Sequence, residues 1–225
     1  MRTIDAVIFD MDGVLIDSER ISFKCFQEVF KEYNYEIDEP FYLKVIGRNF
    51  EGIKALMVEE YGDDFPFDII YRKKADLAHE ITNKNGVIVK PGVHELLDYL
   101  NQKKYKIAVA SSTRKERVLE LLEEAKIKDK VDYIIGGDQV ENSKPNPEIF
   151  LKAAKGLDIK PENCMVIEDS DAGITAAHAA KMIGIHVPDM KFLEDENKDL
   201  AFKICGSLSE VKEYLEENKK TNSLN

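Results

Sequence analysis

Two acidic residues, Asp10 and Asp12, come directly after a short apolar run near the start of the chain, and Gly13 follows them. The run, residues 6–9, has the length and composition that are typical of a strand buried on both faces. Because charge is costly inside a core, we expect the acids where the strand leaves it, which is where open parallel sheets bind ligands. Carboxylates this close repel one another without a cation between them, which indicates a Mg²⁺ site and an anionic substrate.

Further polar residues follow two later apolar runs, 107–110 and 164–167, or lie in a loop before a predicted helix. They are Ser111, Ser112 and Thr113, then Glu168 and Asp169, and Lys144 in the loop. Because the carboxyl ends of parallel strands meet at one edge of a sheet, we expect these residues to lie beside Asp10 and Asp12. Carboxylates suit a hard cation, whereas hydroxyls, a lysine and free backbone amides suit a phosphate.

From residue 106 onward, apolar runs alternate with helical patterns. We expect strands at 107–110, 131–135, 164–167 and 183–187. The spacing of Thr113 and Glu116 is typical of a capping box at a helix start, and Asn146 and Ser170 are expected to cap two further helices, the first with Pro147 in its first turn. This alternation predicts an α/β fold, a Rossmann-like parallel sheet with helices on both faces.

The segment 17–86 breaks the alternation and contains little that reads as strand. Apolar and aromatic residues such as Phe23, Phe26 and Phe30 recur there at helical spacing, which favours a packed helical face over a cofactor site. We therefore expect a small all-α domain at 17–86, inserted after strand 1 of an α/β core formed by 1–16 and 87–225.

These motifs resemble those of the haloacid dehalogenase (HAD) superfamily. Its four ordered motifs are similar to Asp10-Met-Asp-Gly-Val14, Ser111, Lys144-Pro145 and Glu168-Asp-Ser170. The helical insert resembles the first type of cap domain in that superfamily, C1, which is found in the subgroup with β-phosphoglucomutase and small sugar-phosphate phosphatases. The resemblance covers essentially the whole chain, and four motifs in order are far more specific than any one of them.

The resemblance implies roles for these residues. Asp10 is expected to attack phosphorus and form an aspartyl phosphate, and Asp12 to act as general acid and base. The implied Mg²⁺ ligands are Asp10, Asp12 through its backbone carbonyl, Glu168 and Asp169. The implied substrate and phosphate contacts are Gly13, Arg48, Ser111, Ser112 and Lys144. Related caps place a basic residue near Arg48 to grip the substrate, although a plain surface arginine is the alternative. Lys73 and Lys74 have the same two interpretations, and for them the surface role is favoured more.

We therefore expect a Mg²⁺-dependent phosphatase that acts on a small phosphorylated metabolite, a sugar phosphate. The alternative is an isomerase of the β-phosphoglucomutase type, but Ser22 stands where that enzyme has a histidine, five residues after an aspartate that matches Asp17. A catalytically silent sugar-phosphate binder is disfavoured because both Asp10 and Asp12 are present. A calcium loop is disfavoured because the later acidic positions of such a loop are missing.

Composition narrows the partners. The chain has 225 residues and a net charge of -11, which argues against nucleic acid and anionic membranes as partners. No apolar run approaches about 18 residues, so we expect no membrane span. Three distant cysteines support neither a disulfide framework nor a zinc site, which suggests a cytoplasmic location. The four histidines adjoin no motif, and a monomer is expected although the sequence does not fix the oligomeric state.

Overall fold

The structure, a computed structural model, describes residues 3–46, 48 and 50–222. The chain divides into two compact units. An α/β unit contains Met1–Ile16 and Val89–Asn225, and a helical unit contains Asp17–Ile88.

The α/β unit is built on a parallel sheet, as the alternating pattern predicts. Its strands are β1 (Ala6–Phe9), β2 (Lys106–Ala110), β3 (Tyr133–Ile135), β4 (Cys164–Glu168), β5 (Ile183–His186) and β6 (Lys203–Ile204). They pair in the order β3-β2-β1-β4-β5-β6, all in parallel. The strands β1, β2 and β4 are central and almost wholly buried, which explains why their residues form continuous apolar runs. The expected Rossmann-like fold is thus confirmed.

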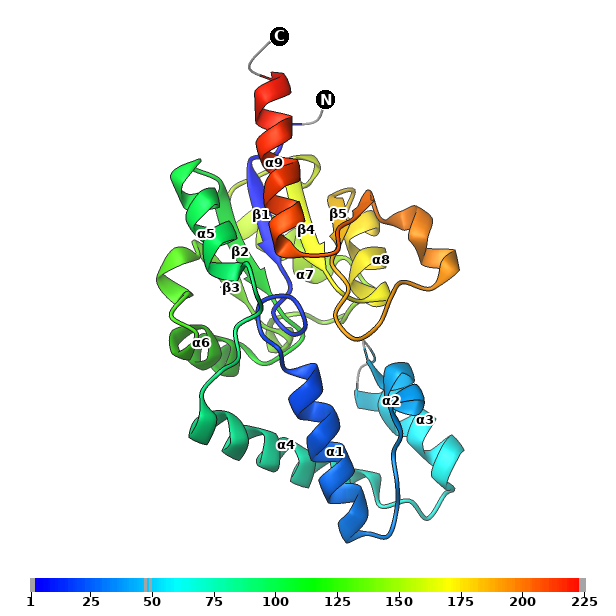
Figure 1. Ribbon diagram of the computed structural model, residues 1–225. Coiled ribbons are helices and arrows are strands. Elements are labelled where there is room, and N and C mark those ends of the chain that lie inside the picture. The colour runs from blue at the N-terminus through cyan, green and yellow to red at the C-terminus, as the bar shows by residue number, and fades with distance from the viewer. Residues whose placement is uncertain (1–2, 47, 49, 223–225) are drawn as a thin grey trace. The chain divides into compact units, whose positions relative to one another are not determined.

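Helices cover both faces of this sheet. On one face, α7 (Glu148–Gly156) and α8 (Asp171–Ala179) share a buried core with β1, β2 and β4. On the other face, α5 (Val93–Gln102) and α9 (Leu208–Asn222) lie in front of the strands (Figure 1). The remaining helices of this unit are α6 (Lys115–Glu124) and the short 3-10 helices η1 (Lys128–Lys130), η2 (Gly137–Gln139), η3 (Pro161–Asn163) and η4 (Asp195–Leu200).

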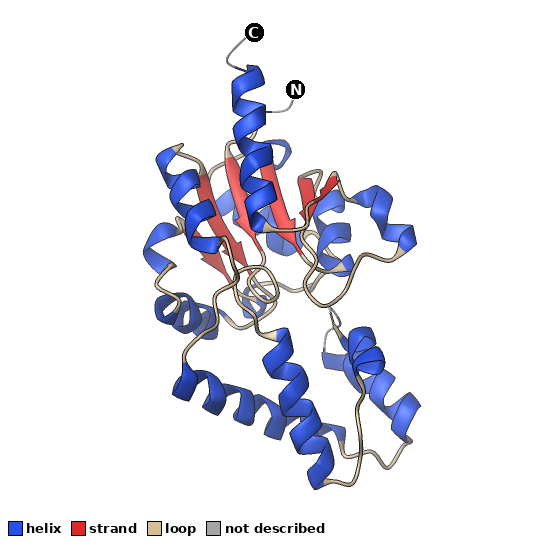
Figure 2. Cartoon of the chain, viewed as in Figure 1, coloured by secondary structure: helices blue, strands red, loops and turns tan. Residues whose placement is uncertain are grey.

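The helical unit contains α1 (Glu19–Glu32), α2 (Glu39–Val45), α3 (Phe50–Tyr61) and α4 (Phe67–Asn85), and Figure 2 shows no strand among its described residues. Its core is aromatic. Phe26 and Phe30 are buried, their ring centroids lie 5.9 Å apart, and Phe30 also meets Tyr61 at 5.3 Å. Packing is therefore the role of the aromatic residues at helical spacing.

Of three predicted helix starts, one is right and two are wrong. Ser170 caps α8, because its hydroxyl accepts from the amide of Gly173 at 3.0 Å. Thr113 does not cap α6, which begins at Lys115 and whose first amide donates to Asp138 at 2.8 Å. Asn146 is not the cap of α7, because the helix begins at Glu148 with Pro147 at the N-cap rather than in the first turn, yet the Asn146 side chain still accepts from the Glu148 amide at 3.0 Å.

The structure also bears on membrane spans and on the cysteines. Within the described ranges, no helix has both the length and the apolar character that a membrane crossing requires. Cys25, Cys164 and Cys205 are free and buried, so they pack as small apolar side chains.

Candidate active site

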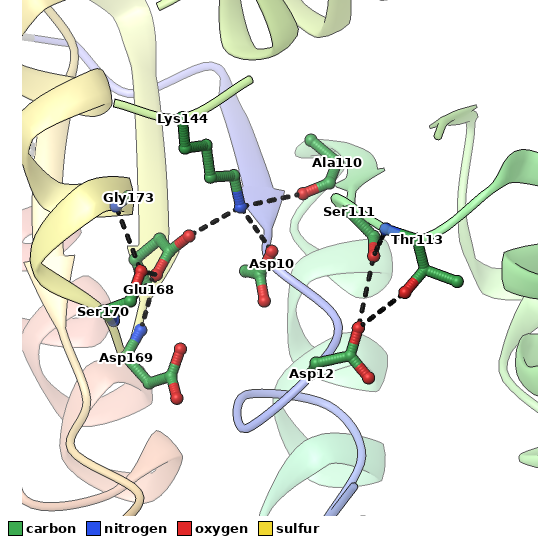
Figure 3. Close-up of polar contacts among 10 residues, drawn as sticks. All are labelled: Asp10, Asp12, Ala110, Ser111, Thr113, Lys144, Glu168, Asp169, Ser170 and Gly173. Atoms are coloured by element: carbon green, nitrogen blue, oxygen red, sulfur yellow. Dashed lines mark hydrogen bonds and ion pairs between the residues drawn. The ribbon is translucent and has the colours of Figure 1, made fainter. Parts of the chain in front are cut away.

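The carboxyl ends of the three central strands bring most of the predicted residues together (Figure 3). Asp10 follows β1, Ser111 follows β2, and Glu168 ends β4. Phe9 of β1 pairs with β2 on one side and β4 on the other, so the residues that follow these pairs emerge at the same edge. The order of strands along the chain also reverses here, with β1 lying between β2 and β4. Such a switch point is where open α/β sheets bind ligands.

Lys144 is the cation of this group. Its Nζ donates to Asp10 Oδ1 at 2.5 Å, to Glu168 Oε1 at 2.6 Å and to the carbonyl oxygen of Ala110 at 3.4 Å. The lysine side chain is only 7% exposed. A buried ammonium group is stable only when carboxylates and carbonyls surround it, so this loop is tied to both β1 and β4 by charge.

Both oxygens of Glu168 are engaged by the protein. Oε1 accepts from Lys144, while Oε2 accepts from the amides of Asp169 and Ser170 and from the Ser170 hydroxyl, each at 2.9 Å. A Cβ at Gly173 would lie 1.9 Å from Glu168 Oε1, so the first turn of α8 requires glycine here. Glu168 thus positions Lys144 and the start of α8, and its role as a metal ligand remains a prediction.

Burial controls the protonation of this cluster. It raises the pKa of Asp10 to about 8, and the nearby Glu168 and Asp12 add to that rise while Lys144 opposes it. Burial by itself would lower the pKa of Lys144, but the carboxylates of Asp10 and Glu168 outweigh it and raise that pKa. The group therefore holds more carboxylates than cations, and an additional cation would favour the ionised form of Asp10.

The donors suit a magnesium ion, and the set of ligands stays a prediction. Asp169 lies against the loop after β1, where a Cβ at Gly13 would be 2.1 Å from its Oδ2 and where Gly13 has a φ of +78°. In the part of the chain that the structure describes, no three His, Cys, Asp or Glu side chains are arranged to hold a metal by themselves, and the Asp12 ligand expected here is a backbone carbonyl. Mg²⁺ commonly uses only one or two carboxylates, with the substrate phosphate and waters completing its shell. Asp10 and Asp169 are hard oxygen donors in an acidic environment and fit that pattern.

Asp12 and Ser111 both form hydrogen bonds with Thr113, which the sequence places at this strand end but to which it assigns only a helix-capping role. Asp12 Oδ2 accepts from the Thr113 hydroxyl at 3.1 Å and from the Ser111 hydroxyl at 3.4 Å. Ser111 is fully buried, and its oxygen also accepts from the Thr113 amide at 3.0 Å. The only sequence signal for Thr113 was its position two residues after Ser111 at a strand end. Ser112 is exposed.

The predicted basic residues of the insert belong to the helical unit. Arg48 is exposed, and its Nε donates to the carbonyl oxygen of Lys44 at 2.7 Å. Lys73 forms an ion pair with Glu32 at 2.6 Å. Lys74 lies over the ring of Phe26 at 4.9 Å.

His186 was given no role from the sequence, yet it is the register partner of Glu168 in the neighbouring strand β5. It is fully buried, and neither ring nitrogen has a hydrogen-bond partner among the described residues. Burial lowers the pKa of this imidazole, which favours the neutral ring.

Comparisons with known proteins agree with this architecture. The sequence model of the haloacid dehalogenase-like hydrolase family matches residues 7–187. The chain is 34% identical to the phosphorylated carbohydrates phosphatase of Thermotoga maritima over 182 residues, which is 79% of this chain and 82% of that protein. It is 31% identical to the β-phosphoglucomutase of Bacillus subtilis over 189 residues, with coverage of 81% and 82%.

The solved structures lead to the same group. The crystal structure of β-phosphoglucomutase from Clostridium difficile superposes with a TM-score of 0.78 and 27% identity, covering 99% of this chain and all of that one. The family match includes the ends of β1, β2 and β4 and the loop of Lys144. The chain therefore belongs to the haloacid dehalogenase-like hydrolases.

Proposed function

We propose that this protein is a Mg²⁺-dependent phosphatase that hydrolyses a small sugar phosphate through an aspartyl phosphate at Asp10. The observation that carries the proposal is the buried contact of Asp10 with Lys144 at the switch point of the sheet. Relatives named for a phosphorylated-carbohydrate phosphatase and a β-phosphoglucomutase support the substrate class.

Asp10 suits the role of nucleophile for two reasons. A carboxylate needs no neighbouring base once ionised, whereas a serine hydroxyl does. Its approach to a phosphate dianion is a like-charge encounter, which costs several kcal/mol in a low-dielectric pocket, and Lys144 offsets part of that charge. Mg²⁺ bound by Asp10 and Asp169 would neutralise more of it and favour the ionised nucleophile.

Asp12 provides the proton transfers of the proposed reaction. It would protonate the leaving oxygen in the first step and take a proton from the attacking water in the second. The Ser111 hydroxyl, which donates to Asp12 in the structure, would turn to a phosphate oxygen when substrate binds, and the backbone around Ser112 would donate to another. The acid, the hydroxyls and the lysine then surround a single phosphoryl group.

We assign the choice of substrate to the helical unit, in the manner of a cap. The polar side chains at the carboxyl edge of the sheet bind one another, and their chemistry suits a phosphoryl group rather than the rest of a substrate. Arg48 is the proposed substrate contact in the helical unit, as an exposed cation suited to an anionic or hydroxylated ligand.

A β-phosphoglucomutase activity is the second candidate, favoured by the similarity to the Clostridium difficile enzyme over nearly the whole chain. The two activities share formation of the aspartyl phosphate and differ in whether water or a sugar hydroxyl accepts the phosphoryl group. Ser22 in place of the mutase histidine favours the phosphatase.

The test is a screen of phosphate release from sugar phosphates, polyol phosphates and nucleoside monophosphates, with and without Mg²⁺. We expect Mg²⁺-dependent release from at least one sugar phosphate, and none from the Asp10→Asn variant. Rapid conversion of β-glucose 1-phosphate after priming with glucose 1,6-bisphosphate, with little phosphate release, would favour the mutase. Phosphate release that Asp10→Asn leaves intact would contradict both candidates.

A further inference from the structure

Thr113 does not cap α6, although its position in the sequence predicts that role. The start of α6 is served instead by Asp138, whose Oδ1 accepts from the Lys115 amide at 2.8 Å, and Arg114, the residue before the helix, makes no side-chain cap bond. The Thr113 hydroxyl is therefore not needed at the start of α6 and can donate to a residue elsewhere in the unit.

That partner is one oxygen of Asp12. The hydroxyls of Thr113 and Ser111 both donate to Oδ2, at 3.1 Å and 3.4 Å, as Figure 3 shows. A carboxyl group has two oxygens in a fixed plane, so donors on one oxygen also set the direction of the other. In a protonated carboxyl group, a donor at Oδ2 leaves Oδ1 as the oxygen that carries the proton, and the Thr113 hydroxyl still supplies that donor when Ser111 turns to the phosphate.

The backbone of Thr113 is fixed as well. Its amide donates to Ser111 Oγ at 3.0 Å, and its carbonyl oxygen accepts from the amide of Gly137 at 2.9 Å. A Cβ at Gly137 would lie 2.2 Å from the carbonyl oxygen of Ser112, so the backbone of the loop after β2 lies directly against the start of η2. The Thr113 hydroxyl is thus presented by a loop with little freedom to move.

We propose that Thr113 is a positioning residue that fixes Oδ2 of Asp12 and thereby presents Oδ1 to the reacting oxygens. The inference rests on the proposed function. When the Asp10–phosphorus bond forms and the bond to the leaving oxygen breaks, Oδ1 gives its proton to that oxygen. When the oxygen of water bonds to phosphorus and the Asp10–phosphorus bond breaks, Oδ1 takes a proton back from the water. Thr113 itself neither gains nor loses a proton.

Leaving groups of different basicity separate positioning from general damage. Nitrophenolate departs from p-nitrophenyl phosphate without protonation, whereas a sugar alkoxide needs the proton of Asp12. The value of kcat/KM covers the steps up to departure of the leaving group. It is measured for p-nitrophenyl phosphate and for the fastest substrate among glucose 6-phosphate, ribose 5-phosphate and β-glucose 1-phosphate.

For Thr113→Val we expect kcat/KM on the sugar phosphate to fall at least about tenfold, through kcat rather than KM, and on p-nitrophenyl phosphate by less than about twofold. Thr113→Ser should restore most of the loss, because it restores the hydroxyl. Thr82→Val is the matched control, since the Thr82 hydroxyl donates to a backbone carbonyl in α4. This variant should keep the wild-type kcat/KM on both substrates.

An equal loss on both substrates, or no loss on either, would overturn the role of Thr113 and leave the phosphatase proposal intact. Crystal structures of the wild type and Thr113→Val give a second answer that does not depend on turnover. We expect the Asp12 carboxylate to change rotamer or lose order in the variant while Asp10 and Lys144 stay in place. An unchanged Asp12 would also overturn the inference. Absence of phosphate release from every substrate by the wild type would instead contradict the phosphatase itself.

Discussion

The carboxyl edge of the sheet and the surface of the helical unit both hold lysine–carboxylate pairs, but in different surroundings. Lys144 and Lys73 each lie 2.6 Å from a glutamate oxygen. The Lys144 side chain is 7% exposed and has two carboxylate partners, whereas that of Lys73 is 48% exposed. Contact distance is therefore the same in the two regions, and burial is what separates them.

This difference shows where charge is part of a function. An exposed ion pair contributes about 0–1 kcal/mol and can be lost with little effect. A buried charge is costly without its partners, so a cluster that keeps several of them holds each in one geometry. Such a cluster can lower the barrier of a reaction in which charge moves. Substitutions in the buried cluster should therefore reduce turnover far more than substitutions of exposed ion pairs.

The largest effect is expected at the nucleophile. Asp10→Asn should reduce phosphate release at least about a thousandfold, because the amide cannot form the acyl phosphate. Circular dichroism should show an unchanged fold. Asp129→Asn, in the short helix η1, is the control and should keep wild-type rates. Substantial turnover by Asp10→Asn would remove the assignment of the nucleophile.

The two lysines can be compared by the same substitution. Lys144→Met should lower kcat about a hundredfold or more, because it removes the cation beside the attacking carboxylate. Lys73→Met removes a lysine with a similar contact distance from the helical unit and should change kcat by less than about twofold. Similar losses in the two variants, measured by steady-state kinetics, would mean that burial does not distinguish these regions.

A smaller effect is expected where a glycine makes room for Glu168. The added methyl of Gly173→Ala would lie 1.9 Å from Glu168 Oε1 and displace the carboxylate that holds Lys144, so kcat should fall about tenfold. Gly184→Ala is the control, because its methyl meets Ala177 at an ordinary 3.5 Å. Full activity in Gly173→Ala would argue that Glu168 does not position Lys144.

The proposed substrate contact in the helical unit should show a still smaller effect. We expect Arg48→Ala to raise KM several-fold with kcat nearly unchanged, because an exposed arginine contributes to binding rather than to chemistry. Arg48→Lys should recover part of the binding. If KM for every sugar phosphate tested matches that of the wild type, Arg48 is only a surface residue.

The last prediction concerns stability and its dependence on pH rather than turnover. The raised pKa of Asp10, about 8 in the folded protein against about 3.9 when unfolded, means that the unfolded state loses this proton first as pH rises. Without metal, the Tm of the wild type should therefore fall relative to that of Asp10→Asn between about pH 4 and pH 8. Added Mg²⁺ should raise the Tm of the wild type more than that of the variant. Parallel Tm curves for the two proteins, with and without Mg²⁺, would contradict both expectations.

Much of the fold can be predicted from the sequence because the central strands are buried on both faces. Residues 6–9 are fully buried, so their type is restricted to apolar residues and the strand is visible as a run. The two-residue strand β6 is exposed and was not predicted, since exposure imposes no such restriction. The helical unit shows its packing in the sequence but not its ligand, because the aromatic spacing reports only the buried face.

The residues of the site could be predicted from strand ends and from the loop that carries Lys144, but most of their contacts could not. Asp10 and Ser111 follow buried strands, Glu168 ends another, and the topology brings the three together. The bond of Thr113 to Asp12 depends instead on the loop that carries Gly137, which is distant in sequence. The two engaged oxygens of Glu168 likewise depend on Lys144 and the first turn of α8. Contacts of this kind are set by tertiary structure and leave no local pattern.

Phosphorylation of Asp10 can be tested directly by chemical trapping of the phosphorylated enzyme. The protein is mixed with its sugar phosphate and Mg²⁺, quenched in acid within milliseconds and reduced with borohydride, which converts an acyl phosphate of aspartate to homoserine. Peptide mass spectrometry should then find homoserine at position 10 in the wild type, and none at that position in Asp10→Asn. Homoserine at another aspartate, or phosphate release with no trapped residue at any quench time, would contradict the claim that Asp10 carries the phosphoryl group.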